Sequence, residues 1–384
     1  MPSPRLLPSF AHLMLACLFF TVTAGAAVPI PNPPNINARA YVLIDYQSGR
    51  VLAGDKADVQ MEPASITKLM SGYVVFRAIK EKRLALSDMV SISEHAWKAE
   101  GSRTFAQVGT QIPVEVLIKG MTVQSGNDAT IALAEKLGGT EDGFVQMMNS
   151  YTKELGLRNS HFNDASGLPG PTHYMSAHDI ALLSRVLIRD YPEYYKYYSM
   201  REFEWNKIKQ QNRNGLLAKD PSVDGIKTGH TDTAGYCLAA SAKRGDMRLI
   251  SVVLGTQGFK AREDASAALL NYGFTFFETV KAKGAGEVIL KPEVYKGEAE
   301  RVTLVPAQDI YVTVGRGSGT QLKTAATLKD KVIIAPIKAG QALGELTVSD
   351  GATVVARVPL VAKEAVPAGG WWTRTWDSVS LWMK

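Results

Sequence analysis

The stretch Pro63-Ala64-Ser65-Ile66-Thr67-Lys68 places a serine and a lysine three residues apart at a predicted helix start. Residues with this spacing share one face of a helix, so the Ser65 hydroxyl and the Lys68 amine are expected to be neighbours. A serine becomes a good nucleophile only when a base takes its proton. Lys68 can be that base if burial or a second cation lowers its pKa. Alone, the spacing is a weak signal that also fits an ordinary surface helix.

Two further tripeptides supply the groups that such a serine needs, namely Ser125-Gly126-Asn127 and Lys227-Thr228-Gly229. Lys227 would be the second cation that depresses the pKa of Lys68. Ser125 would relay a proton to a leaving amine, and Asn127 would hold a peptide carbonyl. Taken singly, each tripeptide is equally typical of a capped helix start or a turn.

The lysine tripeptide follows Gly225-Ile226, which starts a predicted strand. The edge of that strand can pair with a substrate backbone. The backbone N–H groups of Ser65 and His230 are candidates for an oxyanion hole. The sequence therefore predicts a strand edge and a helix start that face one reaction centre.

The S-x-x-K, S-x-N and K-T-G set, in this order, resembles the penicillin-recognising serine enzymes. It resembles most closely the low-molecular-mass penicillin-binding proteins that act as D-alanyl-D-alanine carboxypeptidases. The resemblance covers nearly the whole chain. It is carried by Pro63–Lys68, Gln124–Ala129, Gln211–Asn214, Asp224–Thr231 and Tyr272–Phe274.

The resemblance implies removal of the terminal D-alanine from peptidoglycan stem peptides, through an acyl-enzyme, with β-lactams as inhibitors. Its implied catalytic residues are Ser65, Lys68 and Ser125. Its implied substrate-binding residues are Asn127, Lys227, Thr228, Gly229, His230, Thr231 and Arg262. Arg262 matches an arginine that engages the terminal carboxylate, although a solvated surface arginine is the plainer alternative.

Three other functions compete with this one. A class A β-lactamase also needs a glutamate for deacylation, and no E-x-x-L-N-like segment lies between Asn163 and Asp179. A D,D-endopeptidase would use the same residues on cross-links. A non-catalytic peptidoglycan-binding protein is disfavoured because every catalytic position is filled. The segment from Ser102 to Phe105 is shorter than expected for close relatives, which leaves substrate preference open.

No cofactor or metal is expected. His161, His173 and His178 lack metal-ligand spacing, and Lys68 takes the role that a histidine has in a Ser-His-Asp triad. Beyond the first 26 residues the only cysteine is Cys237, so no internal disulfide is predicted, and a small buried side chain is expected there. The formal net charge of +6 has no Lys/Arg block, so nucleic acid is not an expected partner.

Both ends of the chain suggest export and a membrane surface. Residues 1–26 fit a signal peptide, with Arg5, an apolar run from Leu13 to Val22 and the cleavage site Ala24-Gly25-Ala26; an uncleaved anchor is the alternative. Four of the six tryptophans lie between Trp371 and Lys384. They predict an amphipathic helix in the membrane interface, detached by Gly369-Gly370, unless the helix folds back onto the protein. The predicted location is periplasmic, peripherally attached to the inner membrane.

The order of predicted elements gives an α/β or α+β catalytic domain over residues 27–280, with a sheet covered by helices. Short β-prone runs then predict a small all-β domain over residues 281–366, followed by the anchor helix over 367–384. The predicted catalytic-domain elements are strands at Tyr41–Asp45, Tyr236–Ala242 and Arg248–Leu254, and helices at Val114–Lys119, Asp128–Leu137, Glu141–Leu155 and Ala177–Ile188.

Overall fold

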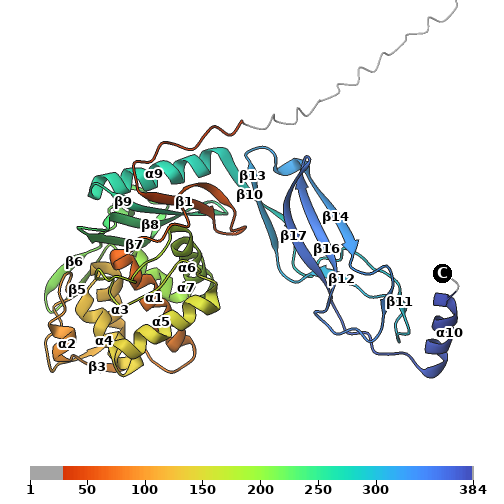
Figure 1. Ribbon diagram of the computed structural model, residues 1–384, viewed down its shortest axis with the longest axis horizontal. Coiled ribbons are helices and arrows are strands. Elements are labelled where there is room, and N and C mark those ends of the chain that lie inside the picture. Colours follow the sequence, from red (N-terminus) through yellow and green to blue (C-terminus); the bar gives the residue numbers. More distant parts are fainter. Residues whose placement is uncertain (1–28, 383–384) are drawn as a thin grey trace, which may run out of the picture.

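The structure, a computed structural model, describes residues 29–382, so the predicted signal at residues 1–26 lies outside the described residues. The N-terminal part is built on a five-stranded sheet in the order β2-β1-β9-β8-β7 (Figure 1). Every neighbouring pair is antiparallel, so the predicted class takes its α+β form. The strands are β1 (Ala40–Asp45), β2 (Val51–Asp55), β7 (Val223–Thr231), β8 (Gly235–Arg244) and β9 (Met247–Thr256).

Helices cover both faces of this sheet. Successive side chains of a strand point to opposite faces. Val42 and Ile44 of β1 accordingly join the hydrophobic cluster that contains α6 (Ala177–Asp190), whereas Leu43 joins the cluster that contains α9 (Phe259–Phe276). Both faces of the sheet therefore carry apolar side chains, and its two edge strands are β2 and β7.

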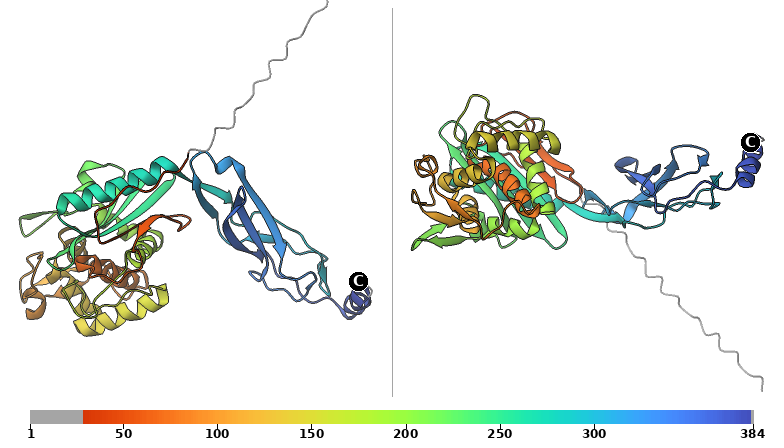
Figure 2. Two further views of the ribbon diagram at one scale, coloured as in Figure 1. Left: turned by 45° about the horizontal axis from the view of Figure 1, so that its top comes forward. Right: turned by 90° about the horizontal axis from the view of Figure 1, so that it is seen from below.

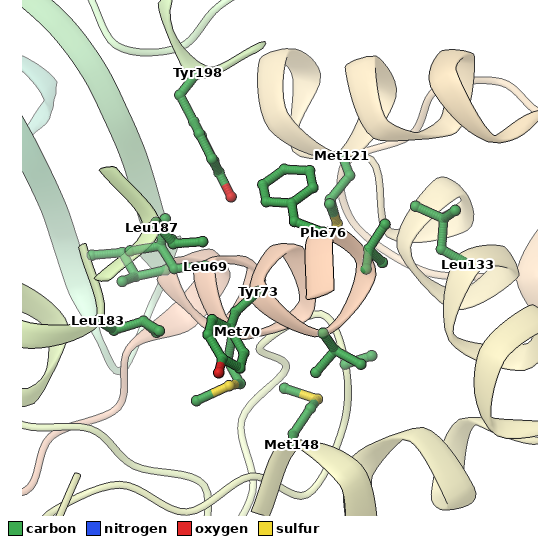
Figure 3. Packing of buried hydrophobic residues seen from close by; sticks show 14 of the residues in the cluster. Leu69, Met70, Tyr73, Phe76, Met121, Leu133, Met148, Leu183, Leu187 and Tyr198 are labelled. Carbon is green, nitrogen blue, oxygen red and sulfur yellow. The ribbon is translucent and has the colours of Figure 1, made fainter. Parts of the chain in front are cut away.

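The helix that follows Ser65 lies at the centre of the helical side. The chain makes a 3-10 turn over Ala64–Thr67 and continues as α1 (Lys68–Lys80). Leu69, Met70, Tyr73 and Phe76 of α1 are buried. Figure 3 shows them surrounded by side chains from other elements, among them Met121, Leu133, Met148, Leu183, Leu187 and Tyr198. This packing fixes the start of α1 and with it the serine and lysine.

The predicted helices are confirmed with small changes of bounds: α3 (Val114–Lys119), α4 (Asn127–Gly138), α5 (Glu141–Leu155) and α6. Sequence reasoning missed α9 and the hairpin of β5 (Glu202–Trp205) and β6 (Ile208–Gln211). It also missed several short elements: β3 (Met89–Ser91), β4 (Gln111–Pro113), α2 (Glu94–Trp97), α7 (Pro192–Tyr195) and α8 (Leu216–Lys219).

The C-terminal part is β-rich and has its own apolar core, which includes Val302, Leu304, Leu346 and Leu360. A four-stranded antiparallel sheet runs in the order β12-β17-β16-β14. Two smaller pairs join β10 to β13 and β11 to β15. The strands are β10 (Phe277–Lys283), β11 (Val294–Tyr295), β12 (Leu304–Pro306), β13 (Ile310–Gly315), β14 (Leu322–Leu328), β15 (Ile333–Ile334), β16 (Ala342–Asp350) and β17 (Thr353–Ala362).

The last helix, α10 (Trp371–Trp382), lies at the far end of the β-rich part from the five-stranded sheet (Figures 1 and 2). Its tryptophan face, formed by Trp371, Trp372, Trp376, Val379 and Trp382, is exposed; Trp372 is 78% and Trp382 is 88% accessible. The alternative in which this face folds back onto the protein is therefore wrong. Gly369-Gly370 does not free the helix completely, because Asp377 accepts a hydrogen bond from the backbone N–H of Lys296.

Within residues 29–382, no helix combines the length and the apolar character needed to cross a membrane.

Candidate active site

A cleft of about 450 Å³ opens between the free edge of the sheet and the helical part. It brings together most of the residues that the three motifs predicted, from positions far apart in the sequence. Its lining residues are Ser65, Gly101, Ser102, Ser125, Asn127, Ser166, Gly167, Leu168, Arg213, Thr228, Gly229, His230, Thr231, Phe259 and Arg262. Lys68 and Lys227 are buried immediately behind this lining.

The predicted contact between Ser65 and Lys68 is present. Lys68 is fully buried, and its Nζ atom lies 3.0 Å from Ser65 Oγ, 2.6 Å from Asn127 Oδ1 and 2.6 Å from the Ser166 carbonyl oxygen. A neutral amine has two N–H donors and one lone pair. Because the amide and carbonyl oxygens can only accept, they take the two N–H groups, and the lone pair is left facing the serine hydroxyl.

Burial lowers the pKa of Lys68 to about 7, because the site disfavours the ammonium form. Arg213 adds to this effect, whereas Asp164, Asp128 and Glu141 oppose it. Of the two predicted causes, burial is therefore the larger, and the cation that adds to it is Arg213, where Lys227 was predicted. The pKa of Lys227 is also held well below its usual range, first by burial and then by Lys68, Arg213 and Arg262.

Ser125 and Lys227 meet across the cleft floor. Lys227 Nζ donates to Ser125 Oγ at 2.9 Å and to the Thr228 carbonyl at 3.0 Å. Ser125 ends a single π turn over Gly120–Gln124 and has a left-handed backbone, with φ of 68°. The next residue, Gly126, has to be glycine, because a Cβ atom there would lie 2.0 Å from Thr104 Oγ1.

Asn127 lines the cleft, but both ends of its amide are already engaged. Oδ1 accepts from Lys68 Nζ at 2.6 Å, and Nδ2 donates to the Glu100 carbonyl at 2.6 Å. Its position therefore serves Lys68 in this structure, in addition to any contact with a peptide carbonyl.

Strand β7 supplies the wall that carries Thr228, Gly229, His230 and Thr231. Gly229 allows this strand to lie against the turn before Ser65, since a Cβ atom would lie 2.7 Å from the Pro63 carbonyl oxygen. The His230 ring stacks on Tyr236 at 4.0 Å between centroids. The imidazole therefore packs against Tyr236, while His230 as a whole is exposed at the cleft.

Arg262, the first-turn arginine of the missed helix α9, is buried and only 1% exposed, so the alternative of a solvated surface arginine is wrong. Its guanidinium donates to the carbonyls of Gly229 at 3.3 Å and Arg213 at 3.2 Å, and it lies 5.0 Å from the centre of the Phe259 ring. Its Nε atom is buried and has no hydrogen-bond partner among residues 29–382. Burial of a fork that is only partly paired indicates a place for an incoming anion.

Sequence reasoning assigned no role to Arg213, although it quoted the segment that contains it, and it missed the loop around Ser166. Both line the cleft. The sequence Asp164-Ala165-Ser166-Gly167 does indicate a turn, because an Asp side chain readily accepts hydrogen bonds from the backbone N–H groups that follow it. Nothing in the sequence indicated that the turn would meet Lys68.

The three histidines do have the structural contacts expected of them. His161 Nδ1 lies 2.8 Å from the Thr172 carbonyl oxygen, and His178 Nδ1 lies 3.0 Å from Asp58 Oδ1. His173 is buried. Cys237 is fully buried as expected, and burial raises the pKa of its thiol to about 11.

An antiparallel sheet, a serine beside a buried lysine, and a Lys-Thr-Gly strand edge around one cleft define a penicillin-recognising serine hydrolase. Residues 27–258 match the family described as D-alanyl-D-alanine carboxypeptidase, and residues 277–368 match the C-terminal domain of penicillin-binding protein 5. The chain belongs to the D-alanyl-D-alanine carboxypeptidase family of serine-type hydrolases.

The similarity to individual members extends over almost the full length. D-alanyl-D-alanine carboxypeptidase DacA of Escherichia coli K12 is 42% identical over 392 residues, covering 99% of this chain and 97% of that protein. Penicillin-binding protein 5 from Haemophilus influenzae is 43% identical with a TM-score of 0.85, covering 88% of this chain and 99% of the other. Penicillin-binding protein 6B from E. coli is 38% identical with a TM-score of 0.73, covering 87% and 98%.

Proposed function

We propose that this enzyme removes the terminal D-alanine from peptidoglycan pentapeptides through an acyl-enzyme on Ser65. The observation that carries the proposal is the arrangement around Lys68. Its pKa is near 7, and two acceptors occupy its N–H groups, so that its lone pair faces Ser65 Oγ at 3.0 Å. The base and the nucleophile are thus prepared before the substrate arrives.

In the first half-reaction, Lys68 Nζ takes the Ser65 proton as Oγ bonds to the carbonyl carbon of the penultimate D-alanine. Ser125, whose hydroxyl is hydrogen-bonded to Lys227, passes a proton to the leaving nitrogen and is reprotonated by Lys68, which returns the amine to its neutral form. The peptide C–N bond breaks and free D-alanine departs. In the second half-reaction, Lys68 deprotonates a water that attacks the ester, and Ser65 regains its proton.

The substrate carboxylate is assigned to the anion-binding end of the cleft. Thr228, Arg213 and Arg262 line that end, whereas Lys227 lies behind it and acts through Ser125. Gly229, His230 and Thr231 offer backbone groups along the strand edge for the substrate peptide. Ser65 and His230 are assigned the oxyanion hole through their backbone N–H groups.

The division of labour along the chain is part of the proposal. Residues 27–280 would form the catalytic domain, 281–366 the β-rich domain and 367–384 the anchor, after removal of residues 1–26 as a signal peptide. Exposure of the tryptophan face of α10 supports attachment to a membrane surface on the periplasmic side, because four tryptophans in water are costly.

Product analysis on a purified pentapeptide muropeptide tests the function. We expect release of one D-alanine per peptide and formation of the tetrapeptide, with no product from Ser65→Ala. A cross-linked dimer supplied in parallel separates the alternatives. Faster cleavage of the dimer than of the pentapeptide would make the enzyme an endopeptidase, and inactivity on both would make it a binding protein.

A further inference from the structure

The loop of residues 163–168, here called the Asp164 loop, is bonded to the start of α1 at two points. The Ser166 carbonyl accepts a Lys68 N–H at 2.6 Å, and the Ala165 carbonyl accepts from Ser71 Oγ at 2.5 Å. Gly167 lies so close to Ala64 that a Cβ atom would be 1.9 Å from the Ala64 carbonyl oxygen. The direction of the Lys68 lone pair therefore depends on where this loop lies.

The carboxylate of Asp164 holds the loop together. Its Oδ1 accepts from the backbone N–H groups of Ser166 at 2.7 Å and Gly167 at 2.6 Å, and from Ser166 Oγ at 2.9 Å. Burial disfavours the ionised form. His173 and these N–H groups outweigh burial, so the pKa of Asp164 stays well below its usual range. Asp164 is therefore a fixed negative charge at working pH.

His173 connects that carboxylate to the residue before Lys68. Its side chain is 1% exposed; Nδ1 lies 3.1 Å from Asp164 Oδ2, and Nε2 lies 2.7 Å from Thr67 Oγ1. When Nδ1–H points at the carboxylate, Nε2 is free to accept the Thr67 hydroxyl proton. The backbone N–H of Asn163 also approaches Nδ1, at 3.3 Å. The chain Thr67–His173–Asp164 thus closes a ring between α1 and the loop.

We propose that Asp164 and His173 are positioning residues that hold the Ser166 carbonyl on Lys68 Nζ, and that the Asp164 carboxylate also acts on that amine through its charge. The inference rests on the proposed role of Lys68 as the base for Ser65. Asp164 and His173 do not line the main cleft, and they would act only through Lys68 and the loop.

The sign of the charge effect follows from the surroundings of Lys68. Burial is the largest influence on the pKa of Lys68, and it disfavours the ammonium form. The charge of Asp164 comes next, and it favours the ammonium form. The charged and titratable groups that face Lys68 and Asp164 are Asp128, Glu141, Arg213, Lys227 and His173, with His95 beside Glu141. Removal of the Asp164 charge alone lowers the pKa of Lys68. The neutral base is then available at lower pH.

The test measures the second-order rate of acylation by benzylpenicillin between pH 5 and pH 9, on the full chain. The acidic limb of the pH–rate profile is the range in which the rate rises as Lys68 loses its proton. In Asp164→Asn, we expect this limb to move to lower pH by about 0.5 unit or more. Asp179→Asn is the matched control, because Asp179 is a buried carboxylate that also caps a loop, through Asn159 N and Ser160 Oγ. It should lower thermal stability and leave the limb in place. A limb that stays in place in Asp164→Asn overturns the charge role.

Thr67→Val tests the other half of the proposal, that the Asp164 loop positions Lys68 Nζ. This test does not depend on the folding of the Asp164 variant. Loss of the Thr67–His173 hydrogen bond should slow acylation about five- to tenfold with the limb unmoved, because the Asp164 charge remains. Thr152→Val, which removes a buried hydroxyl from α5, should leave acylation unchanged. Unchanged acylation in Thr67→Val contradicts the inference. A wild type that forms no penicillin adduct contradicts the proposed function instead.

Discussion

Lys227 Nζ donates a hydrogen bond of 2.9 Å to Ser125 Oγ, and this contact joins the edge strand of the sheet to the helical part at the floor of the cleft. The two residues are 102 positions apart in the chain. The contact orients the Ser125 hydroxyl, which suits the delivery of a proton to a leaving nitrogen proposed for it. The resemblance implied that Lys227 binds substrate, and in this structure its side chain donates to Ser125.

The nucleophile is the first prediction. Benzylpenicillin should form a stable adduct on Ser65, because its Oγ is the only hydroxyl within hydrogen-bond distance of Lys68 Nζ among the described residues. Mass spectrometry of the digested, treated protein locates the adduct. Lys68→Ala should slow acylation at least about a hundredfold, since the base is lost. Lys80→Ala, on the exposed side of the same helix, should acylate normally. An adduct on another residue would remove Ser65 from its role.

The pH dependence of peptide hydrolysis is the second prediction. Lys68 must be neutral to take the Ser65 proton, so kcat/KM should rise as the pH passes through about 7. The Arg213 charge lowers the pKa of Lys68, and Arg213→Gln should therefore move this limb to higher pH. Arg185→Gln is the control: this half-buried arginine of α6 donates to the Tyr46 and Gln47 carbonyls, which follow β1, and it does not line the cleft. A limb that moves equally in both variants would indicate a general loss of structure.

Much of the site followed from the sequence, because its core lies in short motifs whose spacing has local meaning. The three-residue step from Ser65 to Lys68 fixes a contact on one helical turn, and that contact is present at 3.0 Å. The Asp164 loop and Arg213 could not be assigned in this way. Ser166 is 98 residues along the chain from its partner Lys68, and Arg213 is 49 residues from its partner Arg262. Only the packing of the folded chain brings these pairs together.

Helix α9 was a different kind of omission. Its sequence from Phe259 to Phe276 is rich in good helix formers, but a strongly amphipathic pattern is absent because the charged residues Arg262 and Glu263 are buried, as the apolar Leu269 and Leu270 are. In the sequence, charged residues in the first turn of a helix suggest that this turn is exposed to solvent. The same burial is what converts Arg262 from an apparent surface residue into part of the site.

The third prediction concerns the tail. Deletion of residues 371–384 should release the protein from anionic vesicles without loss of activity on soluble peptides. Trp372→Ala combined with Trp376→Ala should weaken partition about tenfold or more, because both side chains are 78% exposed and available to the interface. Trp97→Ala removes an exposed tryptophan from the other part of the molecule and should have no effect. Flotation measures all three. Full binding by the truncated chain would place the membrane contact elsewhere.

The fourth prediction concerns the contact between Gly167 and Ala64. Gly167→Ala should destabilise the protein by about 2 kcal/mol or more, since φ is +93° and the new Cβ would meet the Ala64 carbonyl at 1.9 Å. Gly109→Ala separates the backbone strain from the steric clash, because φ there is +75° and no atom lies within 4 Å of the new Cβ. It should cost only about 1 kcal/mol. Thermal unfolding gives both values, and penicillin acylation should fall only in Gly167→Ala. Equal destabilisation would mean that the contact with Ala64 relaxes freely.

Arg262 carries the last prediction, which concerns why the enzyme trims an end and does not cut within a chain. A carboxypeptidase must recognise a free terminal carboxylate, and a planar guanidinium fork suits that group better than an ammonium. Arg262→Ala should slow hydrolysis of a peptide ending in D-Ala-D-Ala by about ten- to a hundredfold, equivalent to about 1.5–3 kcal/mol for a charge-assisted hydrogen bond. It should slow acylation by penicillin less, because the strained ring of penicillin compensates in part for weaker positioning.

Arg262→Lys keeps the charge but loses the fork, so it should recover only part of the peptide rate. The guanidinium also holds the Gly229 carbonyl of β7, and a collapse of that strand would slow both substrates alike. Second-order rate constants for the peptide and for penicillin, measured on all three proteins, therefore separate recognition from support of the cleft. Equal losses on both substrates would assign Arg262 to support, and an unchanged peptide rate would remove it from the site.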